Sequence, residues 1–594
     1  MTISDKVEFQ EDLRLPNGGV LPKSNASTDS ADSADSSGFY DDHLVDSKEL
    51  EMRPLNKLKG DGDEDDSTRK EKLLASIPEL QESDGIFITS KPWNLEDWLY
   101  PPHLPRECQL LRPENIAIPA CYLLVGILQG LSGPLINVYP LDLNATEAQQ
   151  VTLSSIRSLP ASFKLIFGFI SDNFPIFGFR RKSYMLLGWG LAALSMSALV
   201  LTTNLTLSEE EYEKEDGTIG TQTVAPENAP SVQFLSLTLL LFGTGFWMAD
   251  VMGDSIVAEK AKLEPIHARG ATQSSCYSYR FFGLMVASPF STLLYSWAGP
   301  FYVISLLALL PLSTLPLVYM LGEVQHGEVA STRQQCREIW NTVCSRAVWQ
   351  PLTFVYLYNV LQVGNSAWKQ FLKTTLGFTN VQLNLIQNAA CVLLYLGVIC
   401  YKYFLIDWSW RLVYVVTTLL NGVFSILQVL LIVGITFGLS NFWFALGDDA
   451  FAEFIGGIQF LPTTIMMVHL CPDGSEGASY AMFTTVNNSA LNLSAAFSTL
   501  LLGIWDVSKE ALANHELQGM VNLTVLTTCM QVAGILFVGL LPRTKEELFQ
   551  LREKAHGSSA IGGTIFLAIT FMSIIYSITV GVLNIVAPGW SGES

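Results

Sequence analysis

The chain has 594 residues, of which 49% are hydrophobic and only 15% are charged, and its formal net charge is −20. Soluble proteins usually carry about 25% charged residues, so this composition argues against a soluble globular protein. Apolar stretches of about 20 residues recur along the chain, and each is long enough to cross a bilayer as a helix. We therefore expect an all-α polytopic membrane protein, and the net negative charge makes nucleic-acid binding unexpected.

Residues 1–110 form the first segment, which is rich in Asp, Glu, Ser and Gly. A segment with high charge and low hydrophobicity cannot bury enough apolar surface to offset the loss of chain entropy. We therefore predict a disordered, acidic, cytoplasmic tail, and much of the net negative charge lies in it.

Residues 111–321 are predicted to form an N-terminal bundle of six spans: 115–139, 147–172, 183–203, 231–258, 271–297 and 300–321. The cations Arg180, Arg181 and Lys182 lie between spans two and three and mark the cytoplasmic side, because basic loops favour that side. The acidic loop 204–230 is then expected outside, and Asn204 and Asn144 each begin a sequence typical of glycosylation acceptors.

Residues 322–349 contain Arg333, Arg337 and Arg346, which predict a cytoplasmic linker. Residues 350–541 are predicted to form a C-terminal bundle of six spans: 350–370, 381–404, 410–435, 441–470, 477–503 and 519–541. The last part, 542–594, begins with a basic cytoplasmic segment. Its apolar stretch 561–587 predicts a thirteenth span, accessory to the two bundles.

Three cations fall within predicted spans. Arg157 and Lys164 are seven residues apart in span two and are expected to share a helix face, and Arg280 lies about three turns into span five. Cations within hydrocarbon need anions or water, so each is a candidate to bind an anionic substrate or to pair with carboxylates of span four. The alternative for Lys164 is that its long side chain extends to the membrane surface.

Span four contains two carboxylates, Asp250 and Asp254, which are four residues apart and share one helix face. Two carboxylates close together in a poorly solvated place cannot both be ionised easily, so the pair is a candidate proton carrier. The alternatives are that they line a wet vestibule, or that they pair with the basic loops as conformational latches.

Span ten repeats this arrangement with Asp448, Asp449 and Glu453, of which the last two are four residues apart. The stretch from Gly253 to Glu259 matches the stretch from Gly447 to Glu453 at four places. Parallel repeats of the two halves and chance similarity both remain open as explanations. The three acids are candidates for substrate binding or proton coupling.

The loop after span two carries a recognisable pattern: Gly168, Asp172, Gly178, Arg180 and Arg181. It resembles the conformational loop between helices two and three of major facilitator transporters. The longer pattern G-x-x-S-D-x-x-P-I-x-G-x-R-R-x-x-Y resembles the folate–biopterin transporter family more narrowly, as do the residues around Trp247–Glu259 and Cys471–Gly477. That family has Trp and Pro where this chain has Ala161 and Leu165.

The resemblance implies a major-facilitator-type fold, with two six-helix bundles and here one extra C-terminal helix. It also implies a monomeric secondary transporter in the lipid bilayer that moves folate, biopterin or related pteridines by alternating access, with protons as the coupled ion. We expect the plasma membrane, and an organelle membrane is the alternative.

A carrier of another organic anion or small solute is the nearest alternative function, and a non-transporting receptor or scaffold is a second. An enzyme is not expected, because the sequence has no nucleophile elbow and no phosphate-cradling glycine loop. No cofactor or metal is expected either, since the nine Cys are scattered without a C-x-x-C pair.

Overall fold

The computed structural model describes residues 95–587 except 103, 144, 146, 214–218, 225, 266–269, 326–331, 473 and 554–557. Most of the predicted tail and the predicted acceptor Asn144 lie outside the described residues. The described part is an all-α membrane protein with one small hairpin: β1 (Ser208–Glu213) pairs antiparallel with β2 (Ile219–Val224) in the acidic loop.

The first helix group follows two short segments, α2 (Leu95–Leu99) and a 3₁₀ turn at Arg106–Cys108. It consists of α3 (Ala117–Asn137), α4 (Tyr139–Asp142), α5 (Glu147–Ser158), α6 (Lys164–Asn173), α7 (Lys182–Thr202), α8 (Val232–Ala261), α9 (Ala271–Ala298) and α10 (Pro300–Tyr319). Helix α3 packs against α9 and α10, and α7 packs against α8 and α10.

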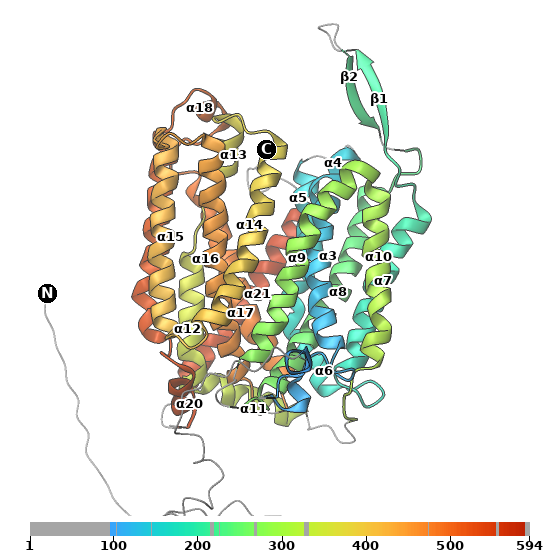
Figure 1. The fold of residues 1–594 in the computed structure, drawn as a ribbon, viewed down its shortest axis with the longest axis vertical. Coiled ribbons are helices and arrows are strands. Elements are labelled where there is room, and N and C mark those ends of the chain that lie inside the picture. Colours follow the sequence, from blue (N-terminus) through green and yellow to red (C-terminus); the bar gives the residue numbers. More distant parts are fainter. Residues whose placement is uncertain are drawn as a thin grey trace, which may run out of the picture. The chain divides into compact units, whose positions relative to one another are not determined.

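A linker helix, α11 (Thr332–Cys344), leads to the second helix group. This group consists of α12 (Arg346–Leu361), α13 (Trp368–Thr374), α14 (Asn380–Cys400), α15 (Trp410–Val433), α16 (Asn441–Leu470), α17 (Glu476–Leu501), α18 (Lys509–Ala513) and α19 (Gln518–Ala533), which continues as a 3₁₀ segment, Gly534–Leu540. A π-helical turn, Tyr401–Leu405, extends α14. The two groups lie side by side, and α9 packs against α14 while α6 and α8 pack against α17 (Figure 1).

Two more helices follow, α20 (Lys545–Glu553) and α21 (Ala560–Val586). We call the end of the bundle at which α6 ends and α7 begins the basic end, after Arg180, Arg181 and Lys182; α11 and α20 lie at this end too (Figure 1). The opposite end, which carries β1 and β2, is the hairpin end.

Nine helices in the described part of the chain are long and apolar enough to cross a membrane, whereas the sequence predicted thirteen spans. The other four segments are helical but differ in length or polarity. Helix α12 has only 16 residues, α17 carries polar residues such as Asn487 and Asn488, and α21 qualifies only as a shorter apolar helix, Ala560–Tyr576.

The fourth such segment is the predicted second span, which is not one continuous helix. A 3₁₀ segment, Leu159–Phe163, separates α5 from α6 and contains Pro160 near its start. Proline cannot donate the backbone hydrogen bond that an α-helix interior requires, so the helix changes its winding here. The prediction that Arg157 and Lys164 share one face of an α-helix is therefore wrong, because a 3₁₀ segment lies between them and regular α-helical spacing does not hold.

Helix α21 packs against both helix groups. It contacts α5 and the 3₁₀ segment of the first group, α12 and α17 of the second, and the linker helix α11. Its contacts with α5 and α17 fall on two of the segments that do not qualify as apolar spans. A polar helix is costly to expose to lipid, so the cover that α21 provides explains how these segments are accommodated.

Close backbone contact joins α3 to α9. A Cβ atom on Gly126 would lie only 1.8 Å from the carbonyl oxygen of Arg280, and one on Gly283 would lie 2.5 Å from the carbonyl oxygen of Leu123. Only glycine allows the two helices to approach this closely.

We predict that Gly126→Ala lowers the melting temperature of the purified protein, because the added methyl group must push α3 away from the α9 backbone. Overpacking of this kind costs roughly 1–3 kcal/mol. The matched control is Gly133→Ala in the same helix, since a Cβ there meets nothing within 4 Å. Equal melting temperatures for the two variants in thermal unfolding would contradict the close packing.

Candidate functional site

A buried ion cluster lies in the first helix group, on α6, α8 and α9. Lys164 Nζ lies 2.8 Å from Asp250 Oδ2, and Arg280 Nη1 lies 3.0 Å from Asp250 Oδ1. The side chains of Lys164 and Asp250 are only 6% and 2% exposed. Lys164 also lies over the ring of Trp247, 4.5 Å from its centre, and Arg280 Nε donates to Gln129 Oε1 on α3. One carboxylate thus faces two cations, and the cluster has an excess of positive groups.

The cluster lies well inside the bundle. Lys164 is the first residue of α6, which ends at Asn173, and Arg280 is nine residues beyond the start of α9. At 1.5 Å per residue this places both about 14 Å from the basic end. Lys164 pairs with Asp250 rather than extending to the membrane surface, which was the alternative from the sequence.

A layer of tyrosines lies between the ion cluster and the basic end. Tyr122 donates to Asp254 Oδ1 at 2.6 Å, and Tyr277 donates to the same oxygen at 3.4 Å. The hydroxyl of Tyr277 lies 3.3 Å from that of Tyr480 on α17, which also accepts from Gln273. Although Asp250 and Asp254 are one turn apart, they take different partners, and the Asp254 network reaches the second helix group.

Arg157 does not join the ion cluster. Its guanidinium lies over the ring of Phe246, 5.8 Å from the centre, and the buried Nη2 atom has no hydrogen-bond partner among the described residues. A Cβ atom on Gly243 would lie only 2.3 Å from the carbonyl oxygen of Arg157, so the backbones of α5 and α8 pack closely here. A buried cation without an anion is costly, so Arg157 is available to receive one.

The three acids of α16 lie in a different environment. Trp368 Nε1 donates to both carboxylate oxygens of Asp449, at 3.0 and 3.2 Å. Asp448 is 3% exposed, and Glu453 is exposed. Within the described ranges, none of the three forms a salt bridge, whereas Asp250 forms two.

The loop at the basic end is organised by Arg181, which is fully buried. Its guanidinium lies 2.5 Å from Asp172 Oδ1 and 2.8 Å from Glu259 Oε1, and it donates to the hydroxyl of Ser171. The two carboxylates stabilise the charged guanidinium and so raise its pKa above the ordinary value, against the effect of burial. Two residues that the family-like pattern singled out, Asp172 and Arg181, therefore form an ion pair.

The start of α7 is held by Glu323. Its carboxylate accepts from the backbone N–H groups of Arg180, Arg181 and Lys182, of which Lys182 is the first residue of α7, where backbone donors lack a partner within the helix. A carboxylate also complements the positive end of the helix dipole. Gly178, with a φ of +81°, makes the turn before this helix.

Polar contacts between described residues join the helix groups at the basic end. Asp172 Oδ2 accepts from the backbone N–H of Ala478 at 2.8 Å, and Lys262 Nζ lies 2.6 Å from Glu476 Oε1. A Cβ on Gly168 would lie 2.5 Å from the carbonyl oxygen of the residue before Ala478, so α6 and α17 touch backbone to backbone. The two groups are therefore in close contact at this end.

Sequence reasoning missed several residues that complete these networks, namely Tyr122, Tyr480, Lys262, Glu476 and Glu323. Each contacts a residue on a distant segment, and periodicity carries no information about such contacts. Glu476 had a signal, since it falls within the Cys471–Gly477 stretch that resembles the folate–biopterin family.

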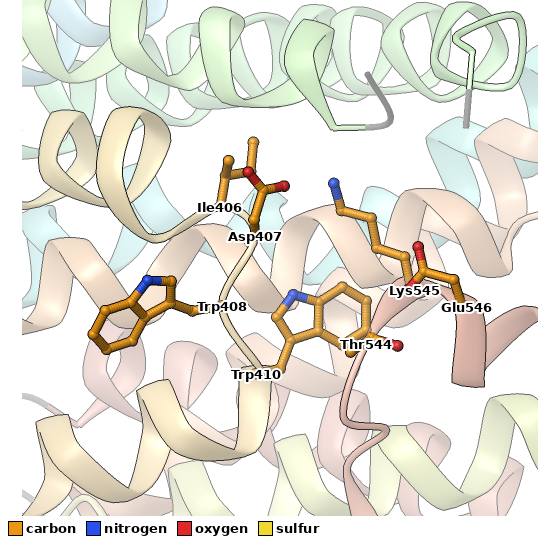
Figure 2. A pocket seen from close by; sticks show the side chains of 7 residues that line it. All are labelled: Ile406, Asp407, Trp408, Trp410, Thr544, Lys545 and Glu546. Atoms are coloured by element: carbon orange, nitrogen blue, oxygen red, sulfur yellow. The ribbon is translucent and has the colours of Figure 1, made fainter. Parts of the chain in front are cut away.

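A pocket of about 110 Å³ lies at the basic end, where the chain enters α15 and α20 (Figure 2). The backbone N–H of Trp410 donates to the carbonyl oxygen of Arg543 and holds the two segments together. The pocket is formed by residues that precede or begin α15 and α20. Its lining side chains are Ile406, Asp407, Trp408, Trp410, Thr544, Lys545 and Glu546. Among the described residues, no three His, Cys, Asp or Glu side chains gather into a metal site.

The sequence of residues 131–210 and 219–556 matches the sequence model of a protein family, the BT1 family. Similar curated proteins include the folate-biopterin transporter of Synechocystis sp., 26% identical over 74% of this chain and 84% of that protein. The probable folate-biopterin transporter 2 of Arabidopsis thaliana is 24% identical over 74% of this chain and 85% of its own length. Folate transporter 1 of Plasmodium falciparum is 23% identical over 66% of this chain and 72% of its own length.

We predict that Asp250→Asn strongly lowers the melting temperature, because Lys164 and Arg280 lose their shared anion. Removing one partner of a buried ion pair costs roughly 3–5 kcal/mol. The double variant Lys164→Met/Asp250→Asn removes one of the two cations as well and should regain part of this loss. An unchanged melting temperature for Asp250→Asn, or a double variant less stable than the single one, would contradict the cluster; Asp506→Asn, in an exposed loop, is the matched control.

Proposed function

Because the chain belongs to the BT1 family, we propose that it is a secondary active transporter that carries folate, biopterin or a related pteridine across a membrane. Transport proceeds by alternating access of a site between the two helix groups and is coupled to protons. Three relatives are named as folate or folate-biopterin transporters, which supports the substrate class.

The observation that carries this proposal is the excess of positive groups inside the first helix group. Lys164 and Arg280 share one carboxylate, and Arg157 forms no ion pair with any described residue. Folate ends in carboxylates, and an arginine can bind a carboxylate through two parallel hydrogen bonds. We assign this carboxylate end to Arg280 and Arg157. Buried charges are costly in a bilayer, and transport of a charged substrate accounts for their presence.

Asp254 is the proposed proton-binding group. Asp250 is balanced by two cations, whereas Asp254 is held by the hydroxyls of Tyr122 and Tyr277. A buried carboxylate with neutral partners binds a proton more readily than one beside cations. Because Tyr277 also contacts Tyr480 on α17, protonation at Asp254 can alter a contact between the two helix groups.

The contacts at the basic end fit an alternating-access cycle. The positive-inside rule makes this end cytoplasmic, so the Asp172–Ala478 and Lys262–Glu476 contacts correspond to a state closed toward the cytoplasm. They must break when the site opens there. Two polar contacts and a glycine contact can be exchanged without unfolding either helix group.

The nearest alternative is a carrier of another organic anion. The cations of the first helix group would accept carboxylates of many kinds, and the chain departs from the family at Ala161 and Leu165. A membrane receptor or scaffold accounts less well for the buried ions. We propose the plasma membrane as the location and a monomer as the transporting unit.

We predict that Asp254→Asn abolishes the accumulation of labelled folate driven by a pH gradient, because an amide cannot carry the proton. Exchange of labelled for unlabelled folate at equal pH should persist, since it needs no net proton movement. Uptake into cells lacking a carrier of their own, with and without a pH gradient, measures both. Gradient-driven accumulation equal to that of the unchanged protein would remove Asp254 from the coupling mechanism.

We predict that Arg280→Gln raises the half-saturation concentration for folate about tenfold or more while that for biopterin changes little, because only folate carries tail carboxylates. Lys164 still pairs with Asp250 in this variant, so this buried carboxylate keeps a cation as its partner. The control is Arg346→Gln, at an exposed position of α12. Equal shifts for folate and biopterin would exclude a role in binding the tail.

A further inference from the structure

The acids of the second helix group lie beside a cavity of about 190 Å³ toward the hairpin end. Its lining comes from the segment between α12 and α13, the first residue of α13, and α15, α16 and α19: Gln362, Gly364, Asn365, Trp368, Asn421, Phe424, Ser425, Gln428, Ala452, Thr527 and Gln531. Five of these residues carry side-chain amides and two are aromatic, whereas none is basic. A polar cavity within a helix group is unusual in hydrocarbon and points to a ligand.

Several buried polar atoms around this cavity have no partner within the described part of the chain. They are Gln362 Nε2, Asn421 Oδ1 and both carboxylate oxygens of Asp448. Gln428, another lining residue, is the polar neighbour of Asp448, although no hydrogen bond of normal geometry joins them. Buried polar groups are paired in the great majority of cases, so a cluster of unpaired ones fits a site that a ligand completes.

Asp448 is placed to face this cavity. It lies one helical turn before Ala452, which lines the cavity, and residues four apart share a helix face. The next residue, Asp449, holds the indole N–H of Trp368 and so fixes that ring at the cavity wall. Phe424 is stacked on Phe451, with ring planes 5° apart, and is likewise fixed in place.

We propose that this cavity binds the aminopyrimidinone edge of a pteridine, with Asp448 accepting hydrogen bonds from the ring N–H and the exocyclic amine. The proposal rests on the proposed function, and it divides the substrate between the helix groups. The ring binds among acids and amides of the second group, and the carboxylate tail binds among cations of the first.

The chemistry of the unpaired atoms matches that edge. An aminopyrimidinone presents two adjacent donors beside a carbonyl acceptor, and a carboxylate can accept from both donors at once. The amides of Gln362 and Asn421 can each present a donor or an acceptor, since an amide can turn over, and one can donate to the carbonyl. Trp368 and Phe424 are fixed aromatic side chains at the wall, suited to contact with a planar ring.

The test measures binding to the purified full-length protein by competition with labelled folic acid. The competitors are pterin, which is the ring alone, and p-aminobenzoylglutamate, which is the tail alone; sodium chloride is a separate arm. Two variants address the cavity: Asp448→Asn removes the carboxylate at constant shape, and Ser425→Leu fills the space without touching the acid. Asp506→Asn is the exposed control, and size-exclusion chromatography checks that each variant is folded.

We expect both cavity variants to weaken binding of pterin and of folic acid by roughly tenfold or more: Asp448→Asn because hydrogen bonds to a charged group are lost, and Ser425→Leu because the larger side chain takes up the space of the ring. Binding of p-aminobenzoylglutamate should be unchanged, and should instead fall in Arg280→Gln.

Unchanged pterin binding in both cavity variants, or an equal loss for ring and tail, would overturn the proposal and leave the transport function standing. A second result would also overturn the proposal: sodium chloride stabilises the unchanged protein but not Asp448→Asn, while this variant still binds pterin as well as the unchanged protein. The cavity would then be a site for an inorganic cation. If the unchanged protein binds neither ring, tail nor folic acid, the proposed function itself fails.

Discussion

Asp250 is the residue on which the arrangement of the first helix group depends. It holds the cations of α6 and α9 at one point about 14 Å from the basic end, where both side chains are largely buried. Because the single negative charge of Asp250 faces two positive charges, it stabilises the packing of these helices but leaves a net positive charge in the interior. The second helix group has the opposite character, since the acids of α16 form no salt bridge among the described residues. An interior positive on one side and acidic on the other suits a substrate with an anionic tail and a donor-rich ring.

The contacts between the helix groups are of a kind that can be exchanged. At the basic end, the contacts between described residues include a backbone hydrogen bond to Asp172, a Lys–Glu pair and a glycine contact, and the next layer is a set of tyrosine hydroxyls. Helix α21 adds a continuous contact to both groups along one side. It covers the polar segments α5 and α17, so it can shield this boundary from lipid.

The sequence predicted the helical membrane fold and the buried charges well, because hydropathy and charge are local properties. It placed Asp250 and Asp254 on one face, and they are one turn apart in α8, but it could not show that Asp250 would bind cations and Asp254 tyrosines. Its argument that Arg157 and Lys164 share a helix face failed, since a 3₁₀ segment with Pro160 separates the two residues. The roles of Tyr480 and Trp368 could not be predicted from the sequence, because Tyr480 contacts Tyr277, and Trp368 contacts Asp449, only through tertiary packing.

The central claim is that the charged interior exists to carry a folate-type substrate. The most direct measurement is the uptake of labelled folic acid into liposomes that contain only the purified protein, under an imposed proton gradient. The account predicts saturable uptake that unlabelled folic acid and biopterin both inhibit. Uptake no faster than into protein-free liposomes, by a protein that elutes as a folded species, would contradict it.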